Sequence, residues 1–195
     1  MLLGKMTTMV HQLLQTQIQP GQVFIDGTVG NGYDTLFLAQ CIGPQGKVFG
    51  FDIQKKALIE AELKLKKEGA MGQAIFIHDC HSKLDQYVKE PIDGAMFNLG
   101  YLPKGDPRII TTPQTTLVAL EKCISLLKPG GVITIVSYYG HKGGEEEKNA
   151  VDEYVKKLDE RTITVGCLSF NNRKQNPPIL YIIEKKKNRK RSNKE

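Results

Sequence analysis

Residues 23–35 read VFIDGTVGNGYDT, and the expected fold follows from this stretch. An apolar run from Val23 to Ile25 ends in Asp26, a glycine-rich turn follows, and a helical pattern then begins near Thr35. A buried strand that passes through a glycine-rich turn into a helix is typical of strand–helix–strand units. We therefore expect a parallel sheet whose first strand ends at Asp26.

The same alternation of apolar runs and helical patterns continues along the chain, after an amphipathic N-terminal helix predicted over residues 1–20. Further buried strands are predicted at 47–51, 74–77, 94–97 and 132–136, with helices near 35–41, 54–67, 115–127 and 145–158. The closing runs at 162–170 and 179–183 have no helix between them, which predicts an antiparallel hairpin at the sheet edge. The prediction is one α/β domain over residues 1–184, with a mostly parallel seven-stranded sheet and helices on both faces.

Composition excludes several classes of protein. The chain has 195 residues, of which 40% are hydrophobic and 25% charged, as expected of one globular domain. No apolar run approaches the roughly 18 residues of a membrane span, and the first 20 residues lack the pattern of a secretory leader. The four cysteines are isolated, so we expect neither a disulfide scaffold nor a metal site, and a cytoplasmic location.

The net charge of +6 belongs to the C-terminal end alone. Residues 185–195 carry seven basic side chains and one acid, whereas residues 1–184 carry 20 of each. We expect a disordered basic tail, which either contacts phosphates or serves only as a solvated, solubilising arm.

The carboxyl ends of the strands predict a binding site, because ligands of open α/β sheets bind there. Asp26 precedes Gly30 and Gly32, and a carboxylate at that point suits a ligand with an amine or cation but repels a pyrophosphate. A nicotinamide-binding fingerprint would also place a glycine where Thr35 stands. The turn therefore argues against a nicotinamide oxidoreductase.

Acids also end the second and third predicted strands. Asp52 is placed to accept from a ribose diol, and Asp79 to pair with an adenine amino group. A nucleoside with a cationic amino-acid end fits all three acids, and this ligand is S-adenosylmethionine. The alternative is that Asp26 and Asp79 only cap helices.

A second group of residues follows the fourth and fifth strands. The Asn98 carbonyl is placed to accept from an exocyclic amine and Tyr101 to stack on a planar base, although an ordinary strand-to-helix turn has the same residues. His141 is a proton acceptor, a phosphate contact or neither. The 171–178 loop either covers the substrate opening, binds RNA backbone or is a simple hairpin loop. His11 faces the site or solvent.

The motifs DGTVGNGYDT (26–35), FDIQ (51–54), FNLGYLP (97–103), YGHKGG (139–144) and NNRKQNPP (171–178) carry a resemblance that covers nearly the whole chain. On them, the chain resembles the bacterial rRNA methylase family of Rossmann-like class I S-adenosylmethionine-dependent methyltransferases. Within that family it is most similar to enzymes that act on 5-aminomethyl-2-thiouridine in tRNA.

This resemblance implies transfer of a methyl group to the aminomethyl nitrogen of the wobble uridine, forming 5-methylaminomethyl-2-thiouridine and S-adenosylhomocysteine, without a metal. The partner would be the tRNA anticodon arm, and a homodimer would help a small protein to span it. An rRNA or small-molecule methyltransferase is the alternative enzyme. A non-catalytic RNA-binding module is the alternative from another class.

The resemblance also assigns residues to roles. The methyl-donor site would comprise Asp26, Gly30, Asn31, Gly32, Asp34, Thr35, Asp52, Gln54, Asp79 and His81. Asn98, Tyr101 and His141 would face the nucleotide. Asp106 completes the predicted catalytic group, and His141 or Asp106 is the candidate that accepts a proton, an assignment based only on their place in the loops at the rim. Further substrate contacts would come from Tyr139, Asn172, Arg173, Lys174, Gln175 and Asn176.

Overall fold

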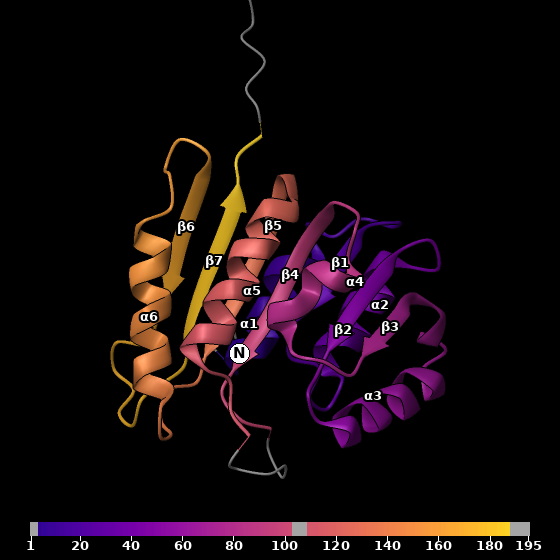
Figure 1. The fold of residues 1–195 in the computed structure, drawn as a ribbon, viewed down its shortest axis with the longest axis horizontal. Helices are drawn as coiled ribbons and strands as arrows, with labels where there is room; N and C mark the ends of the chain where they lie inside the picture. Colours follow the sequence, from indigo (N-terminus) through magenta and orange to yellow (C-terminus); the bar gives the residue numbers. More distant parts are fainter. Residues whose placement is uncertain (1–3, 103–108, 188–195) are drawn as a thin grey trace, which may run out of the picture.

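The computed structural model describes residues 4–102 and 109–187, which form an α/β domain around a single sheet (Figure 1). The strands are β1 (Val23–Asp26), β2 (Lys47–Phe51), β3 (Ala74–Ile77), β4 (Ile92–Leu99), β5 (Leu127–Ser137), β6 (Ile163–Leu168) and β7 (Ile179–Lys185). The helices are α1 (Met6–Gln15), α2 (Tyr33–Ile42), α3 (Lys55–Lys67), α4 (Leu84–Tyr87), α5 (Pro113–Leu126) and α6 (Gly144–Lys156).

The strand order is β3-β2-β1-β4-β5-β7-β6. Strand β7 runs in the opposite direction to the other six, so it is antiparallel to both β5 and β6. This confirms the predicted seven-stranded, mostly parallel sheet with an antiparallel edge hairpin. The order reverses between β1 and β4, which pair in parallel. The carboxyl ends of β1 and β4 therefore form the topological switch point where ligands of such sheets bind.

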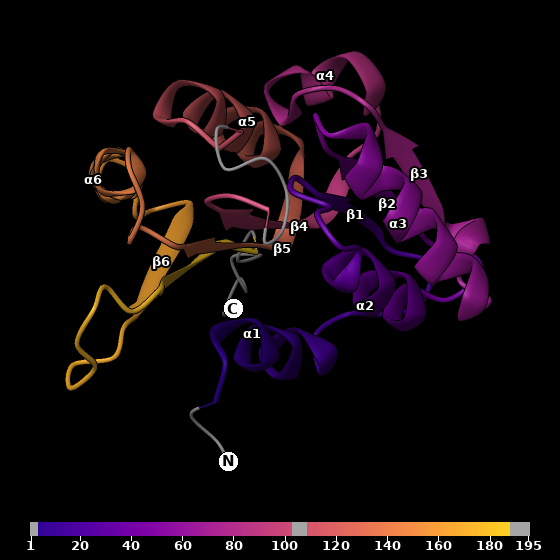
Figure 2. The same cartoon turned by 90° about the horizontal axis from the view of Figure 1, so that it is seen from below.

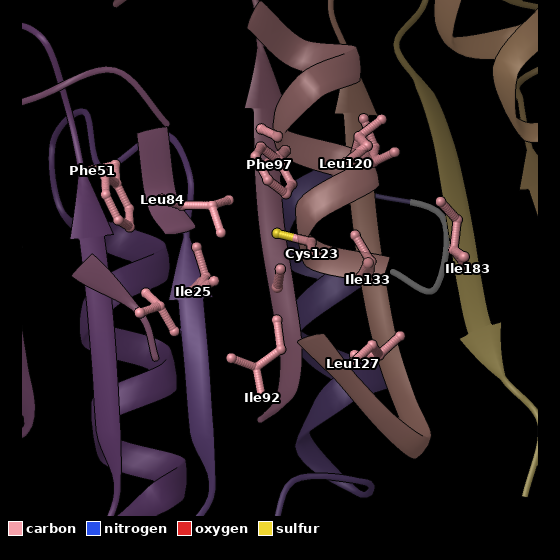
Figure 3. Packing of buried hydrophobic residues seen from close by; sticks show 14 of the residues in the cluster. Ile25, Phe51, Leu84, Ile92, Phe97, Leu120, Cys123, Leu127, Ile133 and Ile183 are labelled. Carbon is pink, nitrogen blue, oxygen red and sulfur yellow. The ribbon is translucent and has the colours of Figure 1, made fainter. Parts of the chain in front are cut away.

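Helices cover both faces of the sheet, as Figure 2 shows from below. One apolar cluster joins α1 and α2 to the sheet through residues such as Met9, Leu38 and Phe24. The other joins α4, α5 and α6 to the opposite face. Figure 3 shows this second cluster, in which Leu120 and Cys123 of α5 pack beside Phe97 and Ile133.

Two predicted boundaries are wrong. The N-terminal helix spans Met6–Gln15 rather than residues 1–20, because the chain tightens into a turn in which Gln17 N donates to Leu14 O. The expected tail also begins too early. Lys185 lies in β7, and Lys186 N donates to Thr162 O, so these two residues extend the edge hairpin.

The helix α4 was not predicted, since four residues carry too little periodicity to be recognised. Residues 188–195 of the expected tail lie outside the described part of the chain. Within the described ranges, none of the helices has the length and apolar character needed to cross a bilayer.

Candidate active site

A cavity of about 1020 Å³ lies at the carboxyl ends of the parallel strands. Its walls come from the turn after β1, the ends of β2 and β4, helix α1, and the segments that follow β4 and β5. This volume lies at the upper end of the range for ligand pockets. It is large enough for two ligands of nucleoside size side by side.

Asp26 does not reach the cavity, contrary to the prediction that it contacts the cationic end of the ligand. Its side chain is fully buried and accepts from Thr28 N at 3.1 Å and from Thr35 Oγ1 at 2.5 Å. Burial, together with repulsion from Asp34, raises the pKa of Asp26 to about 7. Asp26 and Thr35 thus stabilise the turn after β1 without lining the cavity.

Asp34, in the first turn of α2, is the acid of this segment that lines the cavity. His11 Nε2 lies 2.6 Å from Asp34 Oδ1, and the Asn98 side-chain amide donates to Asp34 Oδ2. The His11 ring stacks on Phe37, with ring centroids 4.0 Å apart. His11 therefore faces the site, and α1 is part of its wall.

The two glycines of the turn have different roles. Gly30 lines the cavity, whereas Gly32 does not and instead precedes α2 with a φ of 72°. A Cβ built on Gly32 would stand 2.6 Å from the Ala61 Cβ, closer than such atoms approach. Gly32 thus allows α3 to pack against the turn, and Asn31 beside it faces the cavity.

Asp52 and Gln54 lie on the rim at the end of β2, as predicted. The Asp52 carboxylate accepts from Gly30 N at 2.9 Å and from Gln54 N at 2.8 Å. Burial raises the pKa of Asp52, and the two amide hydrogen bonds oppose the shift. Each oxygen keeps a free lone pair, so the fixed carboxylate can accept from two hydroxyls of a diol.

Asp79 also lines the cavity, but its carboxylate already has three partners. It accepts from Cys80 N, Lys83 Nζ and Tyr87 Oη, each at 2.8 Å, and these bonds lower its pKa to about 2. The helix-capping alternative is wrong for Asp26, because α2 has Gly32 at its N-cap. Asp79 serves the turn that follows β3.

His81 lies in the floor of the cavity and is 7% exposed. Its Nδ1 lies 2.8 Å from Gly27 O, so Nδ1–H is the donor and Nε2 carries the lone pair. Burial lowers the pKa of His81, which keeps the ring neutral. His81 Nε2 is buried without a hydrogen-bond partner among the described residues.

Asn98 also lines the cavity, and its side-chain amide has a fixed orientation. Because an ionised carboxylate only accepts, the Asn98 amide must direct Nδ2 toward Asp34 and Oδ1 away from it. Asn98 Oδ1 is buried and has no partner within the described part of the chain. A buried acceptor left unpaired costs about 1–3 kcal/mol, which a ligand that donates there would recover.

Tyr101 and His141 lie on the same wall of the cavity. Tyr101 is 52% exposed and meets the His141 ring edge to face, with centroids 5.6 Å apart. His141 Nδ1 lies 3.0 Å from Lys142 O, and Nε2 is buried against the Gly144 backbone. A role as proton acceptor would require this ring to turn. Asp106, the other expected proton acceptor, lies outside the described residues.

Of the predicted substrate contacts in the 171–178 loop, the structure brings only Asn176 to the cavity. Asn172 to Gln175 are exposed beyond its rim, because the β6–β7 loop extends away from the sheet. The Tyr139 ring is also outside, with Lys148 Nζ 5.5 Å from its centroid. Gln175 and Asn176 both have positive φ, a strained arrangement that directs Asn176 inward.

Sequence reasoning missed several cavity residues, among them Thr111 and Tyr138. It also missed Glu147, which is 1% exposed and bonded to Thr111. The helical spacing of Glu147, Val151 and Val155 was the available signal, since it places all three on the buried face of α6.

Comparisons with known proteins agree with this site. A family model described as "Putative rRNA methylase" matches residues 48–184. The chain is 35% identical over 192 residues to the chloroplastic tRNA (mnm(5)s(2)U34)-methyltransferase of Arabidopsis thaliana. The matched region covers 93% of this chain and 70% of that protein.

Two solved structures are similar over almost their whole length. A methylase of the same description from Clostridium thermocellum is 42% identical, with a TM-score of 0.92, covering 95% of this chain and 100% of that one. A methyltransferase from Streptococcus mutans, solved in complex with S-adenosylhomocysteine, is 39% identical, with a TM-score of 0.85 and coverages of 94% and 99%. The matched fold and the span of the family model place the chain in the rRNA methylase family of S-adenosylmethionine-dependent methyltransferases.

Proposed function

We propose that the protein methylates the aminomethyl nitrogen of 5-aminomethyl-2-thiouridine at the wobble position of tRNA. The observation that carries this proposal is the buried, unpaired Oδ1 of Asn98, a residue that lines the cavity and whose amide is oriented by Asp34. A primary amine has the N–H donor that this oxygen lacks. The 35% identity to a tRNA (mnm(5)s(2)U34)-methyltransferase supports the same substrate.

The methyl donor fits the half of the cavity that contains the β1 turn. Asp52 would accept from the ribose hydroxyls, and His81 Nε2 offers a further buried acceptor. Asp34, Asp52 and Asp79 give this half a negative lining, which favours a cationic ligand. When bound, S-adenosylmethionine supplies a methyl group on a sulfonium, whose transfer to an amine leaves a neutral sulfide.

The residues of the chain then have two tasks. Asn98 fixes one N–H of the amine, so that the nitrogen lone pair points in one direction rather than rotating freely. Tyr101, half exposed at the opening, offers a ring face on which the uracil can stack. The amine must be neutral when it is methylated, because an ammonium has no lone pair.

The test is methyl transfer from labelled S-adenosylmethionine by the purified protein to bulk tRNA, followed by nucleoside mass spectrometry. The tRNA is taken from cells with and without the corresponding gene. We expect conversion of 5-aminomethyl-2-thiouridine only in tRNA from the deletion strain. Transfer to rRNA or to small amines, with none to either tRNA, would refute the proposed substrate and favour the alternative enzyme.

A further inference from the structure

Glu147 is a buried carboxylate that the proposed chemistry does not use. It lies in the first turn of α6 and is 1% exposed, and it directly follows two exposed glutamates, Glu145 and Glu146. Burial raises its pKa, and hydrogen bonds from Thr111 and Thr116 oppose the shift. Burial of a carboxylate lowers the free energy of unfolding unless hydrogen bonds compensate it, so the partners of Glu147 indicate its role.

Both partners are threonine hydroxyls, one from the segment between β4 and α5 and the other from the first turns of α5. Thr111 Oγ1 donates to Glu147 Oε2 and Thr116 Oγ1 donates to Glu147 Oε1, each at 2.6 Å. Thr116 is completely buried in α5 and fixes the carboxylate from one side. The second oxygen is thereby aimed at Thr111, at the base of the loop that follows β4.

The Thr111 hydroxyl transmits this constraint to the main chain. A hydroxyl can donate one hydrogen bond, and Thr111 Oγ1 donates it to Glu147. The lone pairs of the same oxygen are therefore available to accept from Gly100 N, at 2.9 Å. Thr111 N also donates to Gly100 O at 3.0 Å. Gly100 has a φ of 146°, a conformation that L-residues rarely adopt, and these bonds hold it there.

Tyr101 follows directly from Gly100. It forms an isolated antiparallel bridge with Ile110, the residue before Thr111, so the loop is closed at its base by Glu147, Thr111 and this bridge. Leu102, the next residue, lies close to the β1 turn, because a Cβ built on Gly30 would be 3.2 Å from Leu102 Cδ1. The same loop thus shapes the wall that bears Tyr101 and touches the β1 turn of the donor half.

We propose that Glu147 is a positioning residue, which fixes the Thr111 hydroxyl and through Gly100 sets the place of the Tyr101 ring for the acceptor base. This proposal rests on the proposed function for its substrate. Its structural part, the link from Glu147 to Tyr101, does not. Glu147 is outside the cavity lining, and Thr111, its hydrogen-bond partner, is the lining residue through which the proposed effect on substrate use passes.

The structural test uses Tyr101→Trp as a reporter, because the chain has no tryptophan. Acrylamide quenching and emission wavelength are compared in this background with Glu147→Gln added and with Glu145→Gln added, the matched control for loss of an acid from the same helix turn. We expect Glu147→Gln to change the exposure of the introduced tryptophan and Glu145→Gln to leave it unchanged. Identical quenching in the two double variants would overturn the proposal.

The functional test compares kcat and KM for tRNA and the Kd for S-adenosylhomocysteine in the otherwise unaltered chain. We expect Glu147→Gln to lower kcat/KM for tRNA about tenfold, the effect of one lost hydrogen bond, with donor affinity within about twofold. Equal loss of donor affinity and tRNA turnover would indicate general damage and would overturn the positioning role.

Variants of Thr111 keep the test decisive where Glu147→Gln does not fold. Thr111→Ser retains the hydroxyl and should retain wild-type turnover, whereas Thr111→Val is isosteric without it and should reproduce the tenfold loss. Equal turnover in the two Thr111 variants would refute the link. A wild-type protein that transfers no methyl group to tRNA would refute the proposed function, while the tryptophan quenching would still decide the role of Glu147.

Discussion

Replacement of Asp34 by asparagine tests whether the direction of the Asn98 amide matters for catalysis. In the wild type, the Asp34 carboxylate can only accept, so Asn98 directs Nδ2 toward it and Oδ1 away from it, and this oxygen is the acceptor that we propose for the substrate amine. An amide at position 34 can donate to Asn98 instead, and the Asn98 side chain can then turn over and present Nδ2 to the substrate amine. A donor would then face a donor.

The expected loss can be worked out from the bonds involved. A hydrogen bond to a charged group contributes about 1.5 to 3 kcal/mol, which corresponds to about 10- to 150-fold in rate. We therefore expect Asp34→Asn to lower kcat/KM for tRNA within that range. Asp85→Asn is the matched control, since Asp85 is an exposed acid paired with Lys122 away from the cavity, and it should stay within about twofold.

The exchanged pair makes the test sharper. In Asp34→Asn combined with Asn98→Asp, the new amide donates to residue 98 and its oxygen accepts from His11, so all the hydrogen bonds can form. The carboxylate at 98 then has a second oxygen that can only accept, and it faces the cavity. We expect the double variant to recover part of the activity that Asp34→Asn loses. Initial rates of labelled methyl transfer measure this, and a double variant no more active than the single one would refute the reasoning.

Other positions give predictions of different kinds. The Asp26 pKa of about 7 in the folded protein lies above the usual value of 3.8, so the folded state binds more protons between these pH values; the free energy of unfolding should fall by about 4 kcal/mol through this group as pH rises from 4 to 7, and denaturant titrations should find this slope reduced in Asp26→Asn. Gly32→Ala would clash with Ala61 and should cost about 2 kcal/mol or more, whereas Gly72→Ala, in open space, should change the melting temperature little. Tyr101→Ala should lower kcat/KM for tRNA about tenfold by loss of stacking, with donor affinity unchanged in calorimetry, while Tyr101→Phe should be close to wild type.

Much of the fold could be predicted because each element carries its own periodicity. The strands from Val23 and Lys47 are short apolar runs between glycines and polar turns, and such runs identify themselves without tertiary information. The edge hairpin was recognisable from the absence of a helix between its strands. The order of the strands, in contrast, was not predicted, because it depends on pairing between segments that are distant in sequence.

In the half of the cavity where we propose that the methyl donor binds, the sequence left open which of two neighbouring acids lines the cavity. Asp26 and Asp34 lie in the same turn, and the sequence offers no means of telling which carboxylate is buried and which faces the cavity. The structure distinguishes them, because Thr35 Oγ1 and Thr28 N enclose Asp26 whereas Asp34 opens toward His11 and Asn98. Which acid reaches the ligand depends on how α2 leaves the turn.

The acceptor half depends more on tertiary contacts, and sequence reasoning found less of it. Asn98 and Tyr101 could be singled out because they follow a strand. Glu147 could not be assigned a role, because its partners Thr111 and Thr116 are 36 and 31 residues away in sequence. The reach of the 171–178 loop was overestimated, since Asn176 is the one predicted substrate contact of this loop that lines the cavity.

The His11, Asp34 and Asn98 side chains make α1 a component of the site rather than a cover for the sheet. These residues come from three segments separated by 23 and 64 positions, and the carboxylate between them is the point where all three meet. Because α1 packs against the sheet, the His11 ring can donate a hydrogen bond to Asp34 Oδ1. The other oxygen, Asp34 Oδ2, accepts from Asn98 and orients its amide. Four buried apolar side chains, Met6, Met9, Val10 and Leu14, hold the helix in place. The orientation of the Asn98 side-chain carbonyl therefore depends on the apolar packing of α1, through His11 and Asp34.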